Sequence, residues 1–226
     1  MSAEPMMLGS LRERIAPQHT ALLIVDMQKD FCVDGMGASR RTGRDLSRTQ
    51  AIIPNLVKLR QAARNAGALV VHIGFRTLPN HLSDGGPWLS QRRRSTYAGD
   101  SFAMAGSEGT EFISELSPRE GEVTVHKHRY SGFKGTDLDM ILRAQEIRTC
   151  VVTGASTNVC VESTFRDAFE HGYYIVVPGD GTASWSKELG EGSLQNVTHR
   201  FGLVTTVDEI VETWRGHGGF APRAAA

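Results

Sequence analysis

The chain has 226 residues, of which 40% are hydrophobic and 7% aromatic, enough to bury one sizeable core in a single main domain. Its 25 basic and 25 acidic residues cancel, which argues against the one-signed surface that nucleic acid and anionic membranes attract. We therefore expect a small-molecule partner, no nucleic acid and no membrane.

No apolar run approaches the roughly 20 residues of a membrane-spanning helix, and the N-terminus mixes charge with Met and Leu instead of forming a signal-peptide core. The three cysteines form an odd set without CxxC spacing. They are typical of thiols in a reducing compartment, and neither of a disulfide framework nor of a structural zinc site. The sequence thus predicts a soluble, cytoplasmic protein.

Short apolar runs alternate with longer amphipathic segments along the chain. The apolar runs predict strands at residues 20–27, 68–73, 122–127, 149–154, 173–177 and 203–206. The amphipathic segments predict helices at residues 50–67, 136–145, 159–172 and 207–214. Most strands are apolar on both faces, so the pattern predicts an α/β fold: a doubly wound, Rossmann-like, mostly parallel six-stranded sheet with helices on both faces.

Residues 74–121 do not follow this alternation. They form a long, Gly- and Ser-rich segment, with one short helix expected at 110–116. Long segments of this kind inside compact domains are usually functional, so we expect this one to cover a site or to meet a neighbouring subunit. We interpret its three consecutive arginines, Arg92–Arg94, as a solvated or interface-facing run.

In a doubly wound sheet, ligands bind beyond the carboxyl ends of the strands. Asp26 follows the first predicted strand, Lys127 ends the third, and the turn GASTNVC at 154–160 follows the fourth. An acid, a base and a thiol therefore converge on one edge of the sheet.

Cys160 falls in the first turn of a predicted helix, where unpaired amides and the helix dipole favour a thiolate. The small residues before it let backbone amides turn inward, where they can hold an oxyanion. Cys150 lies inside an apolar strand and is interpreted as a buried hydrophobic residue. Cys32 is interpreted as a packing residue or as part of a pocket wall.

Three stretches, TALLIVDMQKDF, KHRYSGFKGTDLDMILR and VVTGASTNVCVESTFRDAFEHGY, resemble the signature blocks of the isochorismatase-like cysteine hydrolases. The resemblance runs from about residue 19 to residue 214 and includes the chain order Asp, Lys, Cys. It implies an isochorismatase-like fold and a catalytic triad of Asp26, Lys127 and Cys160.

The resemblance also implies a non-proline cis peptide between Ala155 and Ser156, and an oxyanion hole formed by the amides of Ser156 and Cys160. In the implied reaction, Asp26 accepts the thiol proton and Lys127 stabilises negative charge. The Cys160 thiolate attacks a carbonyl carbon, an amine or ammonia leaves, and water hydrolyses the acyl-enzyme. No cofactor is expected.

Within the family, YSGF after the lysine and TNVCVEST around the cysteine look most like the ureido-compound amidohydrolases, namely ureidoacrylate, biuret and triuret hydrolases. N-carbamoylsarcosine amidase has the same triad and stays an alternative. A catalytically inactive binding or scaffold member is an alternative of a different class.

The resemblance implies substrate contacts for four residues: Phe31, Tyr130, Ala155 and Arg200. Phe31 is equally well interpreted as a core aromatic. Arg200 stands near a position where biuret hydrolases place a glutamine, so it could bind a longer polyamide carbonyl or a carboxylate. It is equally well interpreted as a surface cation near a helix C-terminus.

We expect no metal site. Nicotinamidases carry an Asp-x-His pair and a further histidine after the second strand, whereas this chain has His72 and His81 without the pair. His126 and His128 flank Lys127 and point to the opposite face of the strand, so we interpret them as structural.

The expected organisation is an N-terminal arm at 1–18, the hydrolase domain at 19–216 and a C-terminal tail at 217–226. The resemblance implies a homo-oligomer, either a dimer or a tetramer, with the arm and the long middle segment as contact surfaces.

Overall fold

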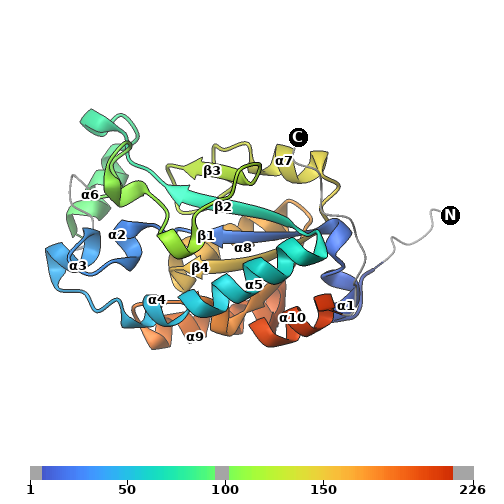
Figure 1. The fold of residues 1–226 in the computed structure, drawn as a ribbon. Coiled ribbons are helices and arrows are strands. Elements are labelled where there is room, and N and C mark those ends of the chain that lie inside the picture. Colours follow the sequence, from blue (N-terminus) through green and yellow to red (C-terminus); the bar gives the residue numbers. More distant parts are fainter. Residues whose placement is uncertain (1–6, 95–101, 216–226) are drawn as a thin grey trace.

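The computed structural model describes residues 7–94 and 102–215, and the predicted tail at 217–226 lies outside them. Its centre is a seven-stranded sheet in which every strand pair is parallel (Figure 1). The strands are β1 (Thr20–Val25), β2 (Leu69–Phe75), β3 (Val123–Lys127), β4 (Thr149–Ala155), β5 (Tyr174–Pro178), β6 (Thr182–Ala183) and β7 (Gly202–Thr205). The strand order is β3-β2-β1-β4-β5-β7, with β6 paired to β4. The predicted doubly wound α/β class is confirmed.

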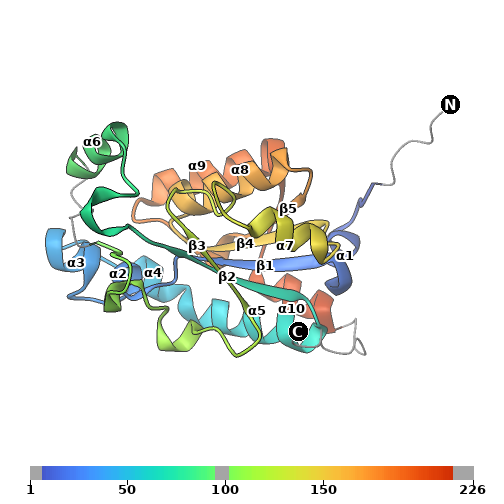
Figure 2. The same cartoon turned by 90° about the horizontal axis from the view of Figure 1, so that it is seen from above.

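Helices cover both faces of this sheet. They are α1 (Leu11–Arg14), α2 (Lys29–Cys32), α3 (Gly37–Thr42), α4 (Ser47–Ala51), α5 (Ile53–Ala66), α6 (Gly86–Arg94), α7 (Leu138–Ala144), α8 (Glu162–Glu170), α9 (Lys187–Asn196) and α10 (Val207–Arg215). Figure 2 shows α5 and α10 on one side of the sheet and α7, α8 and α9 on the other. In the described part of the chain, none of these helices has the length and apolarity needed to cross a membrane.

Alternate residues of β1 face opposite layers, as the two-residue period of a strand requires. Leu22 and Ile24 belong to the core that α5 and α10 cover. Ala21, Leu23 and Val25 belong to the core that α7 and α8 cover. All six residues of β1 are buried, which explains why the strand is apolar from Ala21 to Val25.

The predicted count of six strands is one too low. The additional strand, β6, has two residues, too few to produce a readable periodicity. It pairs with β4 at Gly154 and Ala155, next to the turn that carries Cys160. The missed strand therefore extends the sheet at the edge where the site was predicted.

Helix α9 was also absent from the helices predicted by periodicity. It contains Gly190 and Gly192, and glycine lowers the helical propensity of a segment. Gly190 packs tightly, because a Cβ added there would lie 3.0 Å from the Cβ of Ser184. Tertiary packing thus stabilises a helix that its local sequence disfavours.

The long middle segment contains more regular structure than predicted. It carries α6, and the helix expected at 110–116 is replaced by two short 3₁₀ turns, Glu108–Thr110 and Ser114–Leu116. Within the predicted N-terminal arm, the side chain of Ile15 is fully buried. The Ile15 carbonyl accepts a hydrogen bond of 2.7 Å from the indole of Trp214 on α10, so this part of the arm packs against the domain.

A half-buried ion network links α5 to the start of β3. The Arg64 guanidinium donates to both carboxylate oxygens of Glu122, at 2.6 and 2.8 Å, and His72 Nε2 lies 3.0 Å from the same carboxylate. Burial alone would raise the pKa of Glu122, but the hydrogen bonds from His72 and Arg64 outweigh it and hold that pKa well below its ordinary value of 4.5.

We expect Glu122→Gln to lower the free energy of unfolding at neutral pH by about 2 kcal/mol, because Arg64 then loses its partner. Since the folded-state pKa of Glu122 is depressed, its contribution is present above the ordinary value of 4.5 and is lost as the pH falls below it. Urea unfolding should therefore show a difference between variant and wild type that shrinks in acid. A difference independent of pH would contradict this origin.

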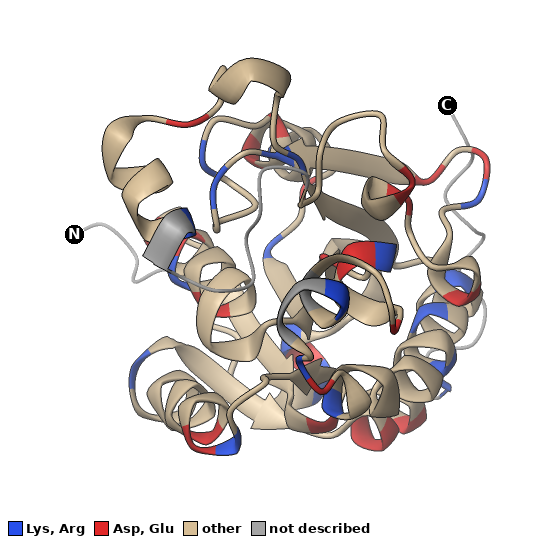
Figure 3. Ribbon diagram, turned by 90° about the vertical axis from the view of Figure 1, so that its left-hand side faces the viewer, with Lys and Arg blue, Asp and Glu red and all other residues tan. Residues whose placement is uncertain are grey.

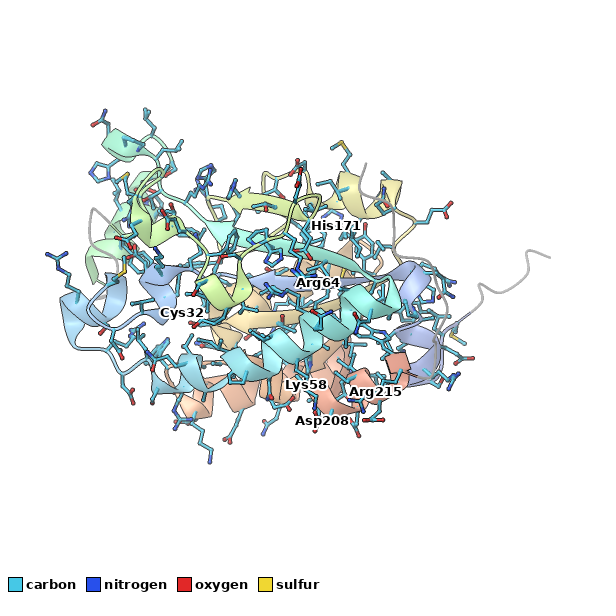
Figure 4. All side chains as sticks on the ribbon, in the orientation of Figure 1. Cys32, Lys58, Arg64, His171, Asp208 and Arg215 are labelled. Carbon is cyan, nitrogen blue, oxygen red and sulfur yellow. The ribbon has the colours of Figure 1, made fainter. Side chains whose placement is uncertain are left out.

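The matched control for this experiment is the exposed ion pair between Lys58 on α5 and Asp208 on α10, two helices that cover the same face of the sheet (Figure 4). Their side chains are 44% and 71% exposed. Because water screens such pairs, Asp208→Asn should change stability very little at any pH.

Candidate active site

Asp26 stands at the point where β1 ends. It is fully buried and has a φ of 54°, in the left-handed region that costs a residue with a Cβ about 1–2 kcal/mol. Beside it, a Cβ on Gly154 would lie 2.1 Å from the carbonyl oxygen of Val25. Glycine at 154 therefore permits β1 and β4 to approach closely at this edge.

Lys127 reaches Asp26 across the end of the strand between them. Lys127 ends β3, which is separated from β1 by β2, and its register partner on β2 is Phe75. The Lys127 Nζ lies 4.9 Å from the centre of the Phe75 ring and 2.9 Å from Asp26 Oδ2, and both charged side chains are fully buried. The long lysine side chain thus forms a buried ion pair over Phe75.

Cys160, which follows the end of β4, is the third member of this group. It lies in a π-helical turn, Thr157–Val161, that leads into α8, and is 5% exposed. Burial raises the pKa of Cys160, the charge of Asp26 adds to this effect, and Lys127 opposes it. The expectation that the helix start lowers this pKa is therefore wrong, because burial and the nearby carboxylate dominate.

The pKa directions suit Asp26 to the role of proton acceptor. Burial raises the pKa of Asp26, against the opposing effects of Lys127 and Cys160. Burial acts to lower the pKa of Lys127, but its interactions with Asp26 and Cys160 together outweigh burial and the pKa rises. The lysine thus stays an ammonium ion, while the carboxylate is more basic than one in water.

The turn between β4 and Cys160 contains a cis peptide bond between Ala155 and Ser156, which confirms that prediction. The Ser156 carbonyl accepts hydrogen bonds from the amides of Val159 and Val161, at 3.0 and 3.2 Å. Among the described residues, the amides of Ser156 and Cys160 donate no hydrogen bond outside the helices and strands. They are the candidate oxyanion donors.

Cys160 lines a cavity of about 60 Å³, and six of the fifteen residues that line it are aromatic. The lining residues are Phe31, Arg44, Asp45, Leu46, Thr49, Phe75, Trp88, Arg92, Phe102, Tyr130, Ala155, Ser156, Val159, Cys160 and Trp185. The structure thus places Phe31, Tyr130 and Ala155 in the same cavity as Cys160, and their contact with substrate stays a prediction.

Arg200 does not reach this cavity. It is exposed and lines a separate surface hollow with Arg14, Tyr174 and Phe201. The reason is topological: Arg200 precedes β7, and Tyr174 begins β5, so both lie at the amino edge of the parallel sheet. The candidate site lies at the carboxyl edge, and Arg200 is therefore left out of it.

Several lining residues were not predicted. Trp88 and Arg92 come from α6, Phe102 from the segment after it, and Trp185 from the turn after β6. The interpretation of Arg92 as solvated or interface-facing is wrong, because it is 9% exposed and lies in the cavity wall. One signal was available: Trp88 and Arg92 are four residues apart, which places them on one face of a helix.

A buried side chain, Gln28, holds the cavity wall in place. Its amide oxygen accepts from the Phe75 amide at 2.7 Å, and its nitrogen donates to the carbonyls of Phe75 and Thr110, at 3.1 and 2.8 Å. Nearby, Asp30 accepts a 2.7 Å hydrogen bond from the amide of Ala103. The DMQKDF stretch thus supplies Asp26 and also fastens the middle segment to the sheet.

The histidines considered as ligands lie apart. His72 pairs with Glu122, His81 lies 3.5 Å from Asp84, and His128 Nδ1 lies 2.7 Å from the Arg76 carbonyl. Over residues 7–94 and 102–215, no three His, Cys, Asp or Glu side chains are grouped so that they could hold a metal ion.

The sequence of this chain is similar to that of a known domain family and of named proteins. The Isochorismatase domain matches residues 20–209. A ureidoacrylate amidohydrolase, RutB, from Variovorax paradoxus strain S110 is 38% identical, over 98% of this chain and 90% of its own length. The corresponding RutB of Pseudomonas syringae pv. syringae strain B728a is 37% identical, over 89% of this chain and 86% of its own.

Solved structures share the fold. A cysteine hydrolase from Pseudomonas syringae pv. phaseolicola 1448A matches with a TM-score of 0.80 and 29% identity, over 96% of this chain and 100% of that one. An N-carbamoylsarcosine amidase from Thermoplasma acidophilum matches with a TM-score of 0.66 and 27% identity, over 84% of this chain and 96% of that one.

Proposed function

The chain belongs to the isochorismatase family, and we propose that it is a metal-independent cysteine amidohydrolase that cleaves a C–N bond of a small ureido or carbamoyl compound. The observation that carries this proposal is that Cys160, which lines the cavity, interacts with the fully buried ion pair of Asp26 and Lys127. A buried acid, a buried ammonium and a thiol are the groups that covalent amide hydrolysis needs.

In the proposed reaction, Asp26 takes the proton from Cys160 Sγ as sulfur attacks the substrate carbonyl carbon. The amides of Ser156 and Cys160 hold the oxyanion, and Lys127 offsets the negative charge that builds up. The C–N bond breaks as Asp26 returns the proton to the departing nitrogen. Water then attacks the thioester, gives a proton to Asp26 and releases the acid, which restores the thiol.

Ureidoacrylate is the substrate that we favour, because the relatives that are 36–38% identical carry the name ureidoacrylate amidohydrolase. The cavity supports a flat substrate, since six of its fifteen lining residues are aromatic. Biuret and triuret are flat as well and stay alternatives. The N-carbamoylsarcosine amidase is a structural neighbour with 27% identity, which keeps N-carbamoyl amino acids among the compounds to test.

We also infer that the domain predicted at 19–216 assembles into a homo-oligomer, either a dimer or a tetramer. Its support is exposed apolar side chains: Leu82 on the middle segment, and Trp185 and Leu189 around the start of α9, are 77%, 46% and 47% exposed. Exposed apolar surface can be buried against another chain. A monomeric mass by light scattering would contradict this inference.

The decisive experiment measures ammonia release from ureidoacrylate, biuret, triuret, N-carbamoylsarcosine and nicotinamide, with and without prolonged chelation. We expect release from a ureido compound, little from nicotinamide and no effect of the chelator. Activity that chelation removes and zinc or manganese restores would contradict a metal-independent mechanism. Silence from folded protein across all five compounds would favour the inactive binding role.

A further inference from the structure

Three charged side chains line the aromatic cavity: Arg44, Asp45 and Arg92. The Asp45 carboxylate accepts hydrogen bonds from the amide and hydroxyl of Ser47, at 2.8 and 2.9 Å, and is exposed at the rim. The Arg44 guanidinium lies over the Trp185 ring at 4.9 Å. Arg92 differs from both because it is 9% exposed. It is the buried cation of the wall.

Buried partners hold Arg92 in its place. Its Nη1 donates to Asp84 at 2.6 Å, and the Asp84 side chain is 1% exposed. Asp84 also accepts a 3.1 Å hydrogen bond from the hydroxyl of Ser83, whose carbonyl accepts from Arg129 at 2.9 Å. A guanidinium fixed in this way loses little freedom when it binds a ligand.

Arg92 lies beside the rings that suit a flat substrate. Trp88, one helical turn earlier on α6, has its ring 4.6 Å from that of Tyr130 and 6.4 Å from that of Phe75. Figure 3 views the molecule from the side on which α2, α3 and α6 lie, and basic and acidic residues are interspersed there. Selection of an anion at this site would therefore depend on an individual side chain and not on a one-signed surface.

We infer that Arg92 recognises a carboxylate on the substrate, so that the cavity selects ureido compounds carrying an acid group over neutral ones of the same shape. This inference rests on the proposed function. The planar guanidinium can donate hydrogen bonds to two carboxylates at once, one being Asp84, which positions it. An uncharged ligand cannot accept the charge-assisted hydrogen bonds that a carboxylate accepts from a guanidinium, and a difference of this kind lets a site discriminate between the two.

The test measures binding to the Cys160→Ser protein, which does not depend on turnover. The probes are 3-ureidopropionate and its neutral primary amide, followed by tryptophan fluorescence, because Trp88 and Trp185 line the cavity. We expect the acid to bind about 10-fold or more tightly than the amide. When Arg92→Gln is added to the Cys160→Ser protein, the affinity for the acid should fall about 10-fold or more. The affinity for the amide should change by less than about 3-fold.

Arg48→Gln, which removes the same charge from the exposed face of α4, is the matched control and should leave the ratio unchanged. If Arg92→Gln leaves Asp84 buried without a partner and fails to fold, Arg92→Gln combined with Asp84→Asn removes both charges and tests the same ratio. If Arg92→Gln weakened the binding of both ligands equally, the inference would be overturned. It would also be overturned if Arg44→Gln, and not Arg92→Gln, removed the preference for the acid. Ammonia release by the wild type separately decides the proposed function.

Discussion

The Cys160→Ser variant should lose at least about 10³-fold in kcat while it keeps the wild-type fold. A serine hydroxyl is a far weaker acid than a thiol, so Asp26 cannot generate the nucleophile from it at a useful rate. The substitution is nearly isosteric at a position that is 5% exposed, so the circular dichroism spectrum and the urea midpoint should change little. The measurement is ammonia release in a single-turnover assay.

Cys150→Ser is the matched control, because Cys150 is a fully buried thiol inside β4 and belongs to the core that α7 and α8 cover. It makes the same chemical change away from the cavity and should keep kcat within a few-fold of wild type at temperatures where it is folded. Near-wild-type turnover by Cys160→Ser would remove the nucleophile assignment, whatever the control shows.

The Lys127→Met variant should lose about 10³-fold or more in kcat, because the ammonium that offsets the developing negative charge is gone. It should also lower the free energy of unfolding by about 3–5 kcal/mol, since Asp26 is left buried beside an apolar side chain. Ammonia release and urea unfolding measure the two effects. Lys58→Met, at a pair whose members are 44% and 71% exposed, is the control and should change both very little.

A double variant separates the catalytic from the structural contribution of this pair. Asp26→Asn combined with Lys127→Met removes both buried charges, so the free energy of unfolding should recover to within about 1–2 kcal/mol of wild type. Activity should stay lost, because the proton acceptor and the ammonium are both missing. Recovery of activity together with stability would mean that the ion pair serves the fold alone.

Much of the fold was predictable because its signals are local. The six strands predicted from apolar runs all overlap strands of the structure, since a strand buried on both faces is mostly apolar. Gly67 and Gly172 end predicted helices, and both have positive φ values, of 77° and 90°, which glycine adopts easily. By contrast, β6 and α9 depend on packing against β4 and Ser184 and left little local trace.

The positions of Asp26, Lys127 and Cys160 at the candidate site were also determined by the sequence. Each lies at or just beyond the carboxyl end of an apolar run, and parallel strands place those ends at one edge. The strand order then decides the distance: Lys127 must cross the end of β2, and it does so over Phe75. Residue type and chain position were therefore sufficient to place these three side chains.

Apart from Phe31, Tyr130 and Ala155, the rest of the cavity wall was decided by the tertiary structure. Trp88, Arg92 and Phe102 belong to a long segment whose path depends on distant partners, among them Gln28, Asp30 and Arg129. Arg200 has the charge expected of a substrate contact, yet it precedes β7 and lies at the opposite edge. The physical reason is the separation in sequence of the interacting residues. A strand end can be predicted from its neighbouring residues, whereas a cavity wall depends on contacts between segments far apart in the chain.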